Sequence, residues 1–476
     1  MIKAGIDAIA FYVPELYVDI KDLALARSIA PEKLQKGLGL QKMAIPDVGE
    51  DAATFAAQAL IELIRKNQVN PKDIGRIYLG TESAVDGSKP TATYAVEMAE
   101  DHLEADFGTR AFKNCDVLDM TFACVGAVDA LHNCLDWVRQ NPNEQAIVIA
   151  SDVSKYDLNS TGEYTQGAGA VAVLIKTDPD ILIINDSWGV ANKSEGDFFK
   201  PRRIYDKNEL LKTVLEAFDI KPSQKQLKEF LEHTNSSFWN DQSQVVSVYK
   251  EEPVFDGQFS NNCYNDRITE ALEQFKAKSS INFLKDWDHL IFHLPYAFHG
   301  RRIIFNNWLK WTKAHNLQAL ENEIGRFEDT VNYTKSAYKS HLFSSFIKHK
   351  VAAGEIASSE IGNMYTASIF MALLSLLSFS LDKEKDLSGS QIGFIAYGSG
   401  SKSKVFSGIV QPFWHEKIAG IGLFKKLKER TPISVEVYED LHKLQRTDSV
   451  KQPNYFLSHM ETGAANYGLR KYQSKS

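Results

Sequence analysis

The predicted order of a strand, an apolar helix and two further strands occurs twice along this chain of 476 residues. In the first copy, the strand in "DIGRIYLGTES" comes before the helix that follows "FACVGA", and "EQAIVIASDVS" and "GAGAVAVLI" supply two more strands. In the second copy, the strand in "DWDHLIFHLPYAF" comes before the helix in "IGNMYTASIFMALLSLL", and "SQIGFIAYGSGSKSKVFSGIVQ" supplies two strands around a Gly/Ser turn. A repeat of this kind predicts two related halves within one fold.

Several of these strands, such as "AIVIA" and "HLIFHL", are apolar at nearly every position. A strand of this type is covered on both faces, because a strand with one face in water alternates apolar and polar residues. We therefore predict a layered α/β architecture with pseudo-twofold duplication. In such sheets, ligands bind beyond the carboxyl ends of the strands, where loops and helix N-termini meet.

Charge and hydropathy narrow the range of partners. The formal net charge is −7, and Lys and Arg form no long block, which argues against nucleic-acid binding because phosphate neutralisation needs clustered cations. Lys3 and Asp7 interrupt the apolar stretch near the start, so we expect no secretory signal. The most apolar segment, "YTASIFMALLSLLSFSL", is shorter than a membrane span and contains Ser and Thr, which predicts a buried core helix and no membrane insertion.

The cysteines are too few and too scattered for a disulfide framework or a CxxC metal site. There are four of them: Cys115, Cys124, Cys134 and Cys263. This usage is typical of a reducing compartment, and we predict a cytoplasmic protein.

Chemically capable residues stand at matching places in the two copies. Glu82 follows the first strand and Cys124 opens the first helix, whereas His293 lies near the end of the corresponding strand in the second copy and Asn363 opens the second helix. The turn at 398–400 adds Gly398, Ser399 and Gly400. Each has an ordinary alternative role, since a glutamate can face solvent, a histidine can be a core residue and an asparagine can be an N-cap.

Cys124 differs from the other cysteines because it stands at a strand-to-helix junction. Unpaired N–H groups and the positive end of the helix dipole favour a thiolate there, with a contribution of roughly 0.3–1 kcal/mol when exposed. The small residues after it leave room for a substrate, and its own N–H can contribute to an oxyanion hole. A buried, inert thiol is the alternative interpretation, and it suits Cys115 and Cys134.

A thiolate, a carboxylate, an imidazole and an amide together suit thioester chemistry. The thiolate accepts an acyl group, the carboxylate removes a carbon-bound proton, and the imidazole and amide bind the carbonyl of a second thioester. A carboxylate is a weak base for carbon acids, so Glu82 needs desolvation and an enolate stabilised by hydrogen-bond donors. The predicted reaction is carbon–carbon bond formation.

The same segments resemble the thiolase superfamily, and within it the 3-hydroxy-3-methylglutaryl-CoA (HMG-CoA) synthase family. "GTESAVDGSKP" resembles the catalytic-glutamate segment, "FACVGA" the acyl-cysteine segment and "FHLPYAFHGRR" the histidine segment. "GNMYTAS" and "YGSGS" resemble the substrate-amide and Gly/Ser segments, and "GEYTQGAGAVAVLI" and "DFFKP" resemble stretches between them. The resemblance covers roughly residues 1–200 and 250–412.

The resemblance implies a thiolase-like α-β-α-β-α fold and a condensation of acetyl-CoA with acetoacetyl-CoA and water, which gives HMG-CoA and free CoA in the mevalonate pathway. Glu82, Cys124 and His293 are the implied catalytic residues. It further implies a homodimer whose only ligands are CoA thioesters, with no metal and no bound cofactor. The implied substrate-binding residues are Asn363, Gly398, Ser399, Tyr365, Thr161, Arg301 and Arg302.

Two positions depart from the family pattern. Val125 follows the cysteine where the family often has an aromatic residue, and Phe298 stands where the family often has a lysine for CoA phosphates. Arg301 and Arg302 can take over that role, because a guanidinium pairs well with phosphate. The alternative is that both arginines lie on a solvated helix face.

We divide the chain into a first half at 1–200, a helical insertion at 202–250, a second half at 251–412 and an extension at 413–476 packed on the second half. In the insertion, "NELLKTVLEAF" and "PSQKQLKEFLEH" have helical spacing and predict an amphipathic pair, the second helix starting at Pro222 and Ser223. In the extension, "PISVEVYED" predicts a strand. The apolar positions of the pair are Leu211, Val214, Leu215, Phe218, Leu227, Phe230 and Leu231.

Three other functions remain open at this stage. A β-branching synthase of polyketide assembly would keep the fold and take its acyl groups from carrier proteins. A ketoacyl-synthase III relative would use Cys, His and Asn, but it lacks a glutamate at the position of Glu82. A catalytically silent paralogue would serve as a scaffold, and the presence of all four site residues argues against it.

Overall fold

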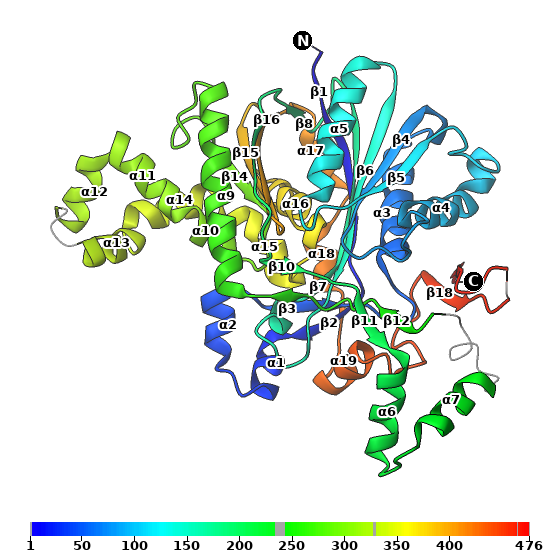
Figure 1. Cartoon of the computed structure of the whole chain (residues 1–476). Helices are drawn as coiled ribbons and strands as arrows, with labels where there is room; N and C mark the ends of the chain where they lie inside the picture. The colour runs from blue at the N-terminus through cyan, green and yellow to red at the C-terminus, as the bar shows by residue number, and fades with distance from the viewer. Residues whose placement is uncertain (1, 234–242, 327–329, 464, 476) are drawn as a thin grey trace. The chain divides into compact units, whose positions relative to one another are not determined.

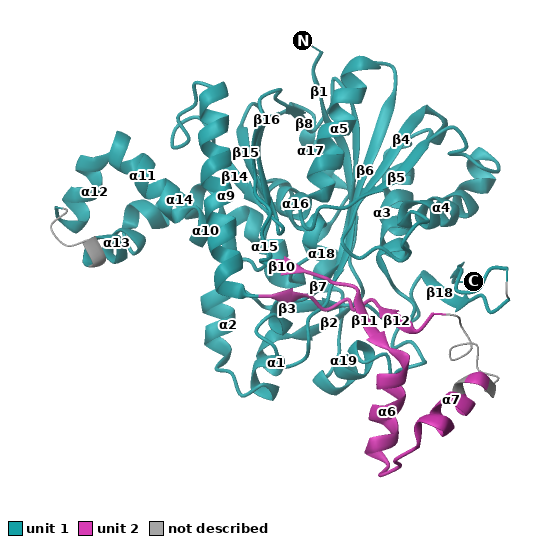
Figure 2. Cartoon of the chain, in the orientation of Figure 1, with its two compact units in different colours: residues 1–197, 256–476 teal, residues 198–255 magenta. Residues whose placement is uncertain are grey.

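The computed structural model describes residues 2–233, 243–326, 330–463 and 465–475. It divides into two compact units (Figure 2). Unit 1 comprises Met1–Asp197 and Asp256–Ser476, and unit 2 comprises Phe198–Phe255. All of the candidate site residues lie in unit 1.

A large mixed sheet forms the centre of unit 1 (Figure 1). Its strands follow the order β14-β15-β16-β8-β1-β7-β6-β4-β5, and β9 pairs with β16. The strands are β1 (Ala4–Tyr12), β4 (Ile74–Gly80), β5 (Asp116–Met120), β6 (Gln145–Ser154), β7 (Gly167–Thr177), β8 (Leu182–Ile184), β9 (Gly189–Asn192), β14 (His289–Phe292), β15 (Gln391–Gly398) and β16 (Lys402–Val410).

The two ends of the sheet repeat one arrangement. In the first half β4 and β6 are parallel, and β7 and then β1 continue in antiparallel pairing. In the second half β14 and β15 are parallel, and β16 and then β8 continue in the same way. The halves join where β1 meets β8, through the pairs Gly5–Ile183 and Ile6–Leu182. The predicted duplication is therefore present.

Helices cover both faces of the first half, as the continuous apolar strands predict. Ile147 and Ile149 of β6 pack in one core cluster with α3 (Ala52–Lys66) and α4 (Thr91–Phe107). Ala146 and Val148, the alternate residues of the same strand, pack in another cluster with α5 (Gly126–Gln140). Each face of a strand thus has its own hydrophobic core.

In the second half, α9 (Gly257–Lys278) contacts β9, β15 and β16, while α16 (Ser368–Asp382) contacts β14. The window Tyr365–Asp382 is long and apolar enough to cross a membrane, but 83% of it is buried inside the protein. The segment is the core helix that its sequence predicts.

Smaller elements complete unit 1. A second sheet has the order β17-β2-β3. These elements are β2 (Leu16–Asp19), α1 (Ile20–Ala26), α2 (Pro31–Leu38), β3 (Lys42–Ile45), η1 (Pro71–Asp73), η2 (Glu163–Thr165), α10 (His299–Ile303), α11 (Phe305–His315), α12 (Leu317–Ile324), α13 (Thr330–Tyr338), α14 (His341–Lys350), α15 (Ala352–Ile361), η3 (Tyr365–Ala367), α17 (Trp414–Ala419), α18 (Leu423–Lys428), β17 (Thr431–Pro432), α19 (Val435–His442), β18 (Tyr455–Met460) and β19 (Arg470–Ser474).

The strand predicted for "PISVEVYED" is wrong. Only Thr431–Pro432 pairs as β17, and α19 begins at Val435. Ser434 is the N-cap, and its side chain accepts a hydrogen bond from the N–H of Val437. A serine cap in front of the alternating residues outweighs their β-propensity.

The C-terminal extension contacts both halves. The helix α17 contacts α16, and α18 contacts α15 and α16, all from the second half. The β18–β19 hairpin instead contacts α3 and α4 of the first half. Residues 413–476 therefore pack on more than the second half alone.

Unit 2 contains two short ribbons and two helices. The strand β10 (Phe198–Phe199) pairs with β13 (Val254–Phe255), and β11 (Arg203–Asp206) pairs with β12 (Val245–Val248). Between them lie α6 (Lys207–Ala217) and α7 (Gln224–His233). Asp206 caps α6 through hydrogen bonds from the N–H groups of Asn208 and Glu209.

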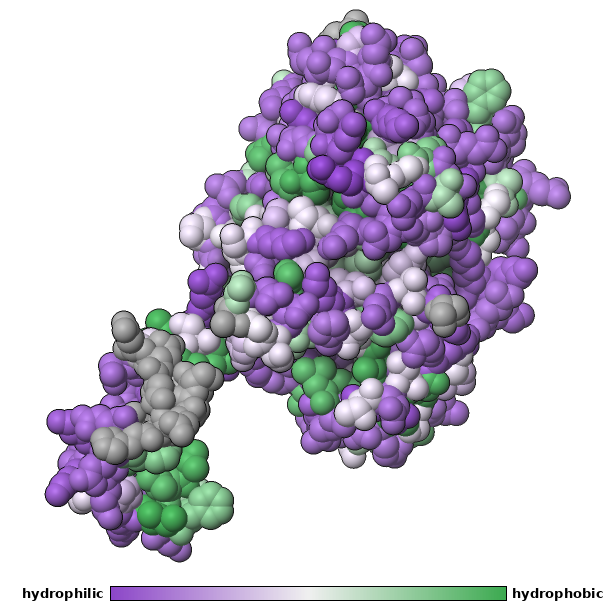
Figure 3. Space-filling model, turned by 90° about the vertical axis from the view of Figure 1, so that its right-hand side faces the viewer, coloured by the Kyte–Doolittle hydropathy of each residue, from purple (hydrophilic) through white to green (hydrophobic). Residues whose placement is uncertain are grey.

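The helices of unit 2 occupy the segments where the amphipathic pair was predicted. Leu211 and Leu227 are buried, whereas Val214, Phe218 and Phe230 are exposed. Figure 3 shows hydrophobic side chains on the surface of the α6–α7 segment, at its lower left. The side chain of Leu231 lies outside the described residues.

Candidate active site

Cys124 and Glu82 meet at the carboxyl ends of two neighbouring strands. Glu82 lies two residues after β4, and Cys124 lies four residues after β5, which pairs with β4 in parallel. The Cys124 thiol donates a hydrogen bond of 2.9 Å to Glu82 Oε1, and Cys124 is 8% exposed. A nucleophile and a carboxylate thus share one sheltered position.

The turn before α5 sets the position of the thiol. Ala123 has a φ of +37°, which is a strained backbone conformation for a residue other than glycine. Cys124 stands directly before Val125, the N-cap of α5, and no side chain among the described residues caps this helix. The uncapped helix N-terminus favours the thiolate form of Cys124.

Glycine allows the Glu82 and Cys124 segments to approach so closely. A Cβ on Gly80, the last residue of β4, would lie 2.3 Å from the backbone nitrogen of Ala127 in the first turn of α5. A Cβ on Gly398, from the second half, would lie 2.7 Å from the carbonyl oxygen of Phe122. Both glycines are therefore needed for the packing around Cys124.

His293 follows β14 and is 2% exposed. Its Nδ1 lies 2.5 Å from Ser368 Oγ, at the start of α16, and that hydroxyl also accepts a hydrogen bond from the N–H of Leu294. Burial lowers the pKa of His293 to about 3, against a smaller opposing effect of a hydrogen bond to the Tyr365 backbone. The imidazole is therefore neutral at physiological pH.

Asn363 and Tyr365 lie before α16 as Cys124 lies before α5. Tyr365 has a φ of +42° and stands three residues before its helix, like Ala123 in the first half. Asn363 is 2% exposed, and its Oδ1 accepts a hydrogen bond from the N–H of Tyr365. The same strained junction occurs in both halves.

Tyr156 links the two junctions. Its pKa is raised first by burial and then by the charges of Cys124 and Glu82, while hydrogen bonds with the side chains of Tyr365 and Asn363 oppose the rise. Burial also raises the pKa of Tyr365, with further contributions from Tyr156, Glu82 and Cys124. Residues of both halves therefore surround one site.

Asp152 is a fully buried carboxylate that ties Glu82 to the second half. Its Oδ1 accepts hydrogen bonds from Thr81 Oγ1 and from the N–H of Glu82, at 3.0 and 2.8 Å. Its Oδ2 accepts hydrogen bonds from the N–H and the hydroxyl of Thr366, at 2.9 and 2.5 Å. Asp152 therefore positions Glu82 relative to the segment that contains Asn363 and Tyr365.

Asp197 holds the Gly/Ser turn. Its Oδ1 accepts a hydrogen bond from the N–H of Gly400, and its Oδ2 accepts one from Tyr397 Oη. Asp197 is fully buried. The turn that contains Gly398 and Ser399 is thereby fixed against the Cys124 segment.

Sequence comparisons identify the family. Residues 2–180 match the model "Hydroxymethylglutaryl-coenzyme A synthase N terminal", and residues 230–464 match the corresponding C-terminal model. The hydroxymethylglutaryl-CoA synthase of Haloferax volcanii is 30% identical over 459 residues, which cover 93% of this chain and 92% of the relative. The chain belongs to the HMG-CoA synthase family.

Solved structures agree with this assignment. "MvaS in complex with 3-hydroxy-3-methylglutaryl coenzyme A" has 27% sequence identity and a TM-score of 0.77, with complete coverage of both chains. The curacin biosynthetic pathway HMG synthase has 19% identity and a TM-score of 0.72 over 99% of this chain and all of that one, which shows a shared fold. The fold is thus the thiolase-like fold of HMG-CoA synthases.

In this HMG-CoA synthase family member, the remaining predicted residues are exposed or engaged in other interactions. Thr161 is exposed on the loop between β6 and η2. Arg301 is bound in an ion pair with the buried carboxylate of Glu355, and its guanidinium lies 3.6 Å from the ring centre of Phe298. Arg302 is exposed and donates to the carbonyl oxygen of Gly37 at 2.6 Å.

Asp152, Tyr156 and Asp197 were missed by sequence reasoning. Asp152 stands near the end of "EQAIVIASDVS", so its place at the end of a strand was an available signal. Its partner Thr366 is 214 residues away, and this distance in sequence hides the contact. Tyr156 had no signal of its own, since an isolated tyrosine in a loop is common.

Proposed function

We propose that this chain is an HMG-CoA synthase that condenses acetyl-CoA with acetoacetyl-CoA and water to give HMG-CoA and CoA, within mevalonate and isoprenoid synthesis. The observation that carries the proposal is the 2.9 Å contact between the Cys124 thiol and Glu82. His293 and Asn363 of the second half complete the set of groups that the reaction needs. Membership of the family supports the choice of substrates.

Acyl transfer is the first step. Cys124 Sγ attacks the acetyl carbonyl carbon of acetyl-CoA, and the bond from that carbon to the CoA sulfur breaks. The thiol proton ends on the departing CoA sulfur, and Glu82 remains a carboxylate for the next step. The uncapped N-terminus of α5 stabilises the sulfur anion and the oxyanion of the intermediate.

Condensation follows at the acetyl group on Cys124. Glu82 lies against the sulfur, so its carboxylate is within reach of the acetyl methyl group. Glu82 takes a methyl proton, and the resulting carbanion attacks the ketone carbon of acetoacetyl-CoA. The new alkoxide regains the proton, and water then cleaves the bond between the acyl carbon and Cys124 Sγ to release HMG-CoA.

His293 and Asn363 bind the second substrate in this scheme. Because the pKa of His293 is about 3, the imidazole acts as a neutral hydrogen-bond partner. When Ser368 Oγ donates to Nδ1, the ring proton resides on Nε2, from which it can reach the ketone oxygen of acetoacetyl-CoA. In this scheme Arg302, which is exposed, binds the CoA phosphates, because Arg301 forms an ion pair with Glu355.

The reaction needs no metal and no bound cofactor beyond CoA thioesters. Thiolate attack, proton abstraction by a carboxylate and thioester hydrolysis are supplied by protein side chains and water. Activity should therefore survive dialysis against a chelator, with the undialysed enzyme as the control. Loss of activity that added Mg²⁺ or Zn²⁺ restores would contradict this part of the proposal.

The deciding assay supplies acetyl-CoA and acetoacetyl-CoA with no carrier protein and follows the formation of HMG-CoA. Turnover is expected from the purified chain alone. Absence of turnover with CoA thioesters, together with turnover of acetyl groups attached to an acyl carrier protein, would favour the polyketide β-branching function. Absence of both would favour a scaffold.

We further propose a cytoplasmic homodimer. None of the four cysteines, all of which lie in the described residues, forms a disulfide, as expected in a reducing compartment. The strand β5 lies at the end of the large sheet, and an outer edge of this kind is a natural site for pairing with a second copy. Light scattering should give twice the chain mass of 53.5 kDa, and a monomer that remains fully active would contradict the proposal.

A further inference from the structure

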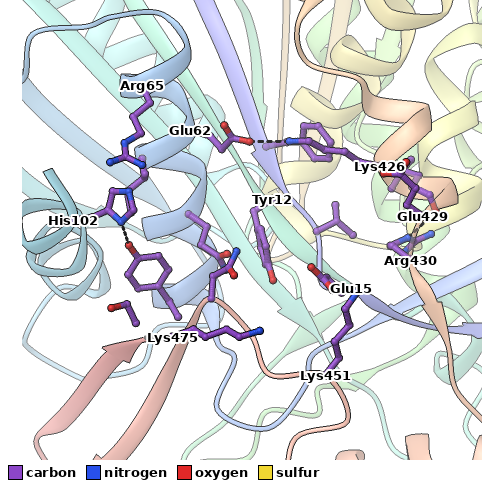
Figure 4. Close-up of a pocket in the computed structure, with 18 residues that line it drawn as sticks. Tyr12, Glu15, Glu62, Arg65, His102, Lys426, Glu429, Arg430, Lys451 and Lys475 are labelled. Atoms are coloured by element: carbon purple, nitrogen blue, oxygen red, sulfur yellow. Dashed lines mark hydrogen bonds and ion pairs between the residues drawn. The ribbon is translucent and has the colours of Figure 1, made fainter.

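A cavity of about 690 Å³ lies in unit 1, lined by none of the candidate catalytic residues. It is bounded by the end of β1, by α3 and α4, by α18 and by the β18–β19 hairpin (Figure 4). Its volume is in the range of small-molecule sites, which is roughly 300–1,000 Å³. The proposed reaction gives this cavity no role.

Cations outnumber acids around this cavity. Among its described lining residues, the five cationic side chains exceed the three acidic ones by two positive charges, although the chain as a whole has a net charge of −7. The cationic side chains are those of Arg65, Lys426, Arg430, Lys451 and Lys475. The acidic side chains are those of Glu15, Glu62 and Glu429. The local field therefore attracts anions against the charge of the whole molecule.

Two of the acids are already neutralised. Glu62 accepts a hydrogen bond from Lys426 at 2.8 Å, and Glu15 forms an ion pair with Lys451. Figure 4 shows the first pair on one side of the cavity, with Lys451 and Lys475 on the opposite side and Tyr12 between them. In the part of the chain that the structure describes, no carboxylate lies within 4.0 Å of the side-chain nitrogens of Lys475 or Arg430.

Arg430 is the most unusual of these cations because it is only 7% exposed. Its guanidinium donates to the carbonyl oxygens of Leu427 and Glu360, while Nη1 has no hydrogen-bond partner among the described residues. Burial lowers its pKa to about 10. The charge of Glu360 acts on this guanidinium, but no carboxylate of the described residues lies within ion-pair distance of it, so an anion in the cavity would balance the remaining charge.

The remaining wall of the cavity is apolar or aromatic. It includes Phe11, Val13, Ile61 and Leu427, together with Tyr455. The Tyr455 hydroxyl bonds to His102 Nδ1, so it is not available to a ligand. A fitting ligand therefore has an anionic group for the cations and an apolar body for this wall.

We propose that this cavity is a binding site for a small organic phosphate. A phosphate group offers several acceptor oxygens and up to two negative charges, which suits a surplus of two positive charges and a guanidinium fork. The cationic side chains that line the cavity attract the phosphate group from several sides, and the apolar wall receives the organic part. The site does not depend on the proposed condensation, because it shares no residue with it.

The test is calorimetric titration of the full chain with phenyl phosphate, inorganic phosphate and phenol. Phenyl phosphate should bind saturably and more tightly than inorganic phosphate, and phenol should not bind. No saturable binding of phenyl phosphate at millimolar concentration would overturn the proposal. Equal binding of inorganic phosphate would overturn its organic part.

Variants locate the site. Arg65→Glu combined with Lys475→Glu changes two partly exposed side chains and should weaken phenyl phosphate binding about tenfold or more. The matched control is Lys310→Glu combined with Lys313→Glu, which makes the same charge change on α11 at exposed positions outside the cavity lining and should leave binding unchanged. Equal weakening in both double variants would show non-specific attraction and overturn the site.

A conservative change at Arg430 adds a second measurement. Arg430→Lys keeps the positive charge and removes the unpaired Nη1, and it should also weaken the binding of phenyl phosphate. Acetylation of Cys124 by acetyl-CoA is measured on every variant and should match the wild-type chain. If a variant loses phenyl phosphate binding and keeps acetylation of Cys124, this site is separate from the proposed function. If Arg430→Lys and the Arg65→Glu/Lys475→Glu variant both bind phenyl phosphate like wild type, the ligand binds elsewhere and the proposal is overturned.

Discussion

Glu82 and Cys124 are 42 residues apart in the sequence, and their side chains meet at 2.9 Å. At this distance the carboxylate lies beside any acyl group on the sulfur, while the attack on acetyl-CoA depends mainly on the helix N-terminus. The two residues therefore have separable roles. In the proposed reaction Glu82 acts on the carbon acid, and Cys124 carries the acyl group.

Glu82→Ala should keep the acetylation of Cys124 and lose condensation by about 10²–10⁴-fold, the usual contribution of a general base. Condensation is measured as HMG-CoA formed, and acetylation as label retained on the protein. Glu104→Ala, an exposed position on α4, is the control and should behave as wild type. Normal condensation by Glu82→Ala would show that another group removes the proton.

At the scale of elements, both junctions of the candidate site are strained turns in front of a helix. The first depends on the close approach of Gly398, a residue from the other half of the chain. An added methyl group there meets Phe122 O at 2.7 Å and Val125 N at 2.9 Å, and the backbone has to move. The turn and the Cys124 segment therefore form one packed unit.

Gly398→Ala should slow the acetylation of Cys124 by about tenfold or more, because small displacements of reacting groups are costly. The overpacking should also destabilise the fold by about 1–3 kcal/mol. Gly37→Ala is the matched control, since a Cβ at Gly37 meets nothing within 4 Å. Single-turnover acetylation and thermal unfolding of both variants are the measurements, and wild-type acetylation by Gly398→Ala would contradict the packing argument.

Local sequence signals predicted much of this arrangement. Cys124, Glu82, His293 and Asn363 were found because each stands at a strand end or helix start in a repeated order of elements. The strand predicted for 432–440 failed because Ser434 caps a helix in front of an alternating pattern. The cap is itself a local signal, and it outweighs the β-propensity of the alternating residues that follow it.

Contacts between residues far apart in the chain could not be predicted from local sequence patterns. Arg301 was expected at the CoA phosphates, but its partner Glu355 lies 54 residues later and is recognised only once the helices pack. Asp152 and Thr366 meet across 214 residues in the same way. Positioning contacts between the two halves depend on the fold, whereas the chemical groups themselves are visible in the sequence.

For the whole molecule, buried histidines make stability depend on pH. Burial lowers the pKa of His293 to about 3 and that of His299 well below 6.5, and both ring nitrogens of His299 lack hydrogen-bond partners among the described residues. Below pH about 6.5 the unfolded chain binds protons that the folded chain does not. Their contribution to stability is therefore complete above that pH and is lost as the pH falls toward the folded pKa.

His299→Phe should remove one of these contributions, because a phenyl ring keeps the stacking on Tyr264 and cannot bind a proton. The fall in Tm between about pH 7.5 and about pH 5 should be smaller in this variant than in wild type. His315→Phe, at an exposed position, is the control and should follow wild type. Burial raises the pKa of Glu50 to about 7, which changes the pH dependence of stability in the opposite direction. The comparison is therefore made between each variant and wild type. A pH dependence of Tm in His299→Phe that is identical to wild type would contradict the role of His299.

The most direct test of the account is to incubate the chain with labelled acetyl-CoA alone, quench with acid and map the label by peptide mass spectrometry. One acetyl group should be found on the peptide that contains Cys124, and adding acetoacetyl-CoA should remove it as HMG-CoA appears. An acetyl group on another residue, or a Cys124 that stays unlabelled while HMG-CoA is formed, would contradict the account.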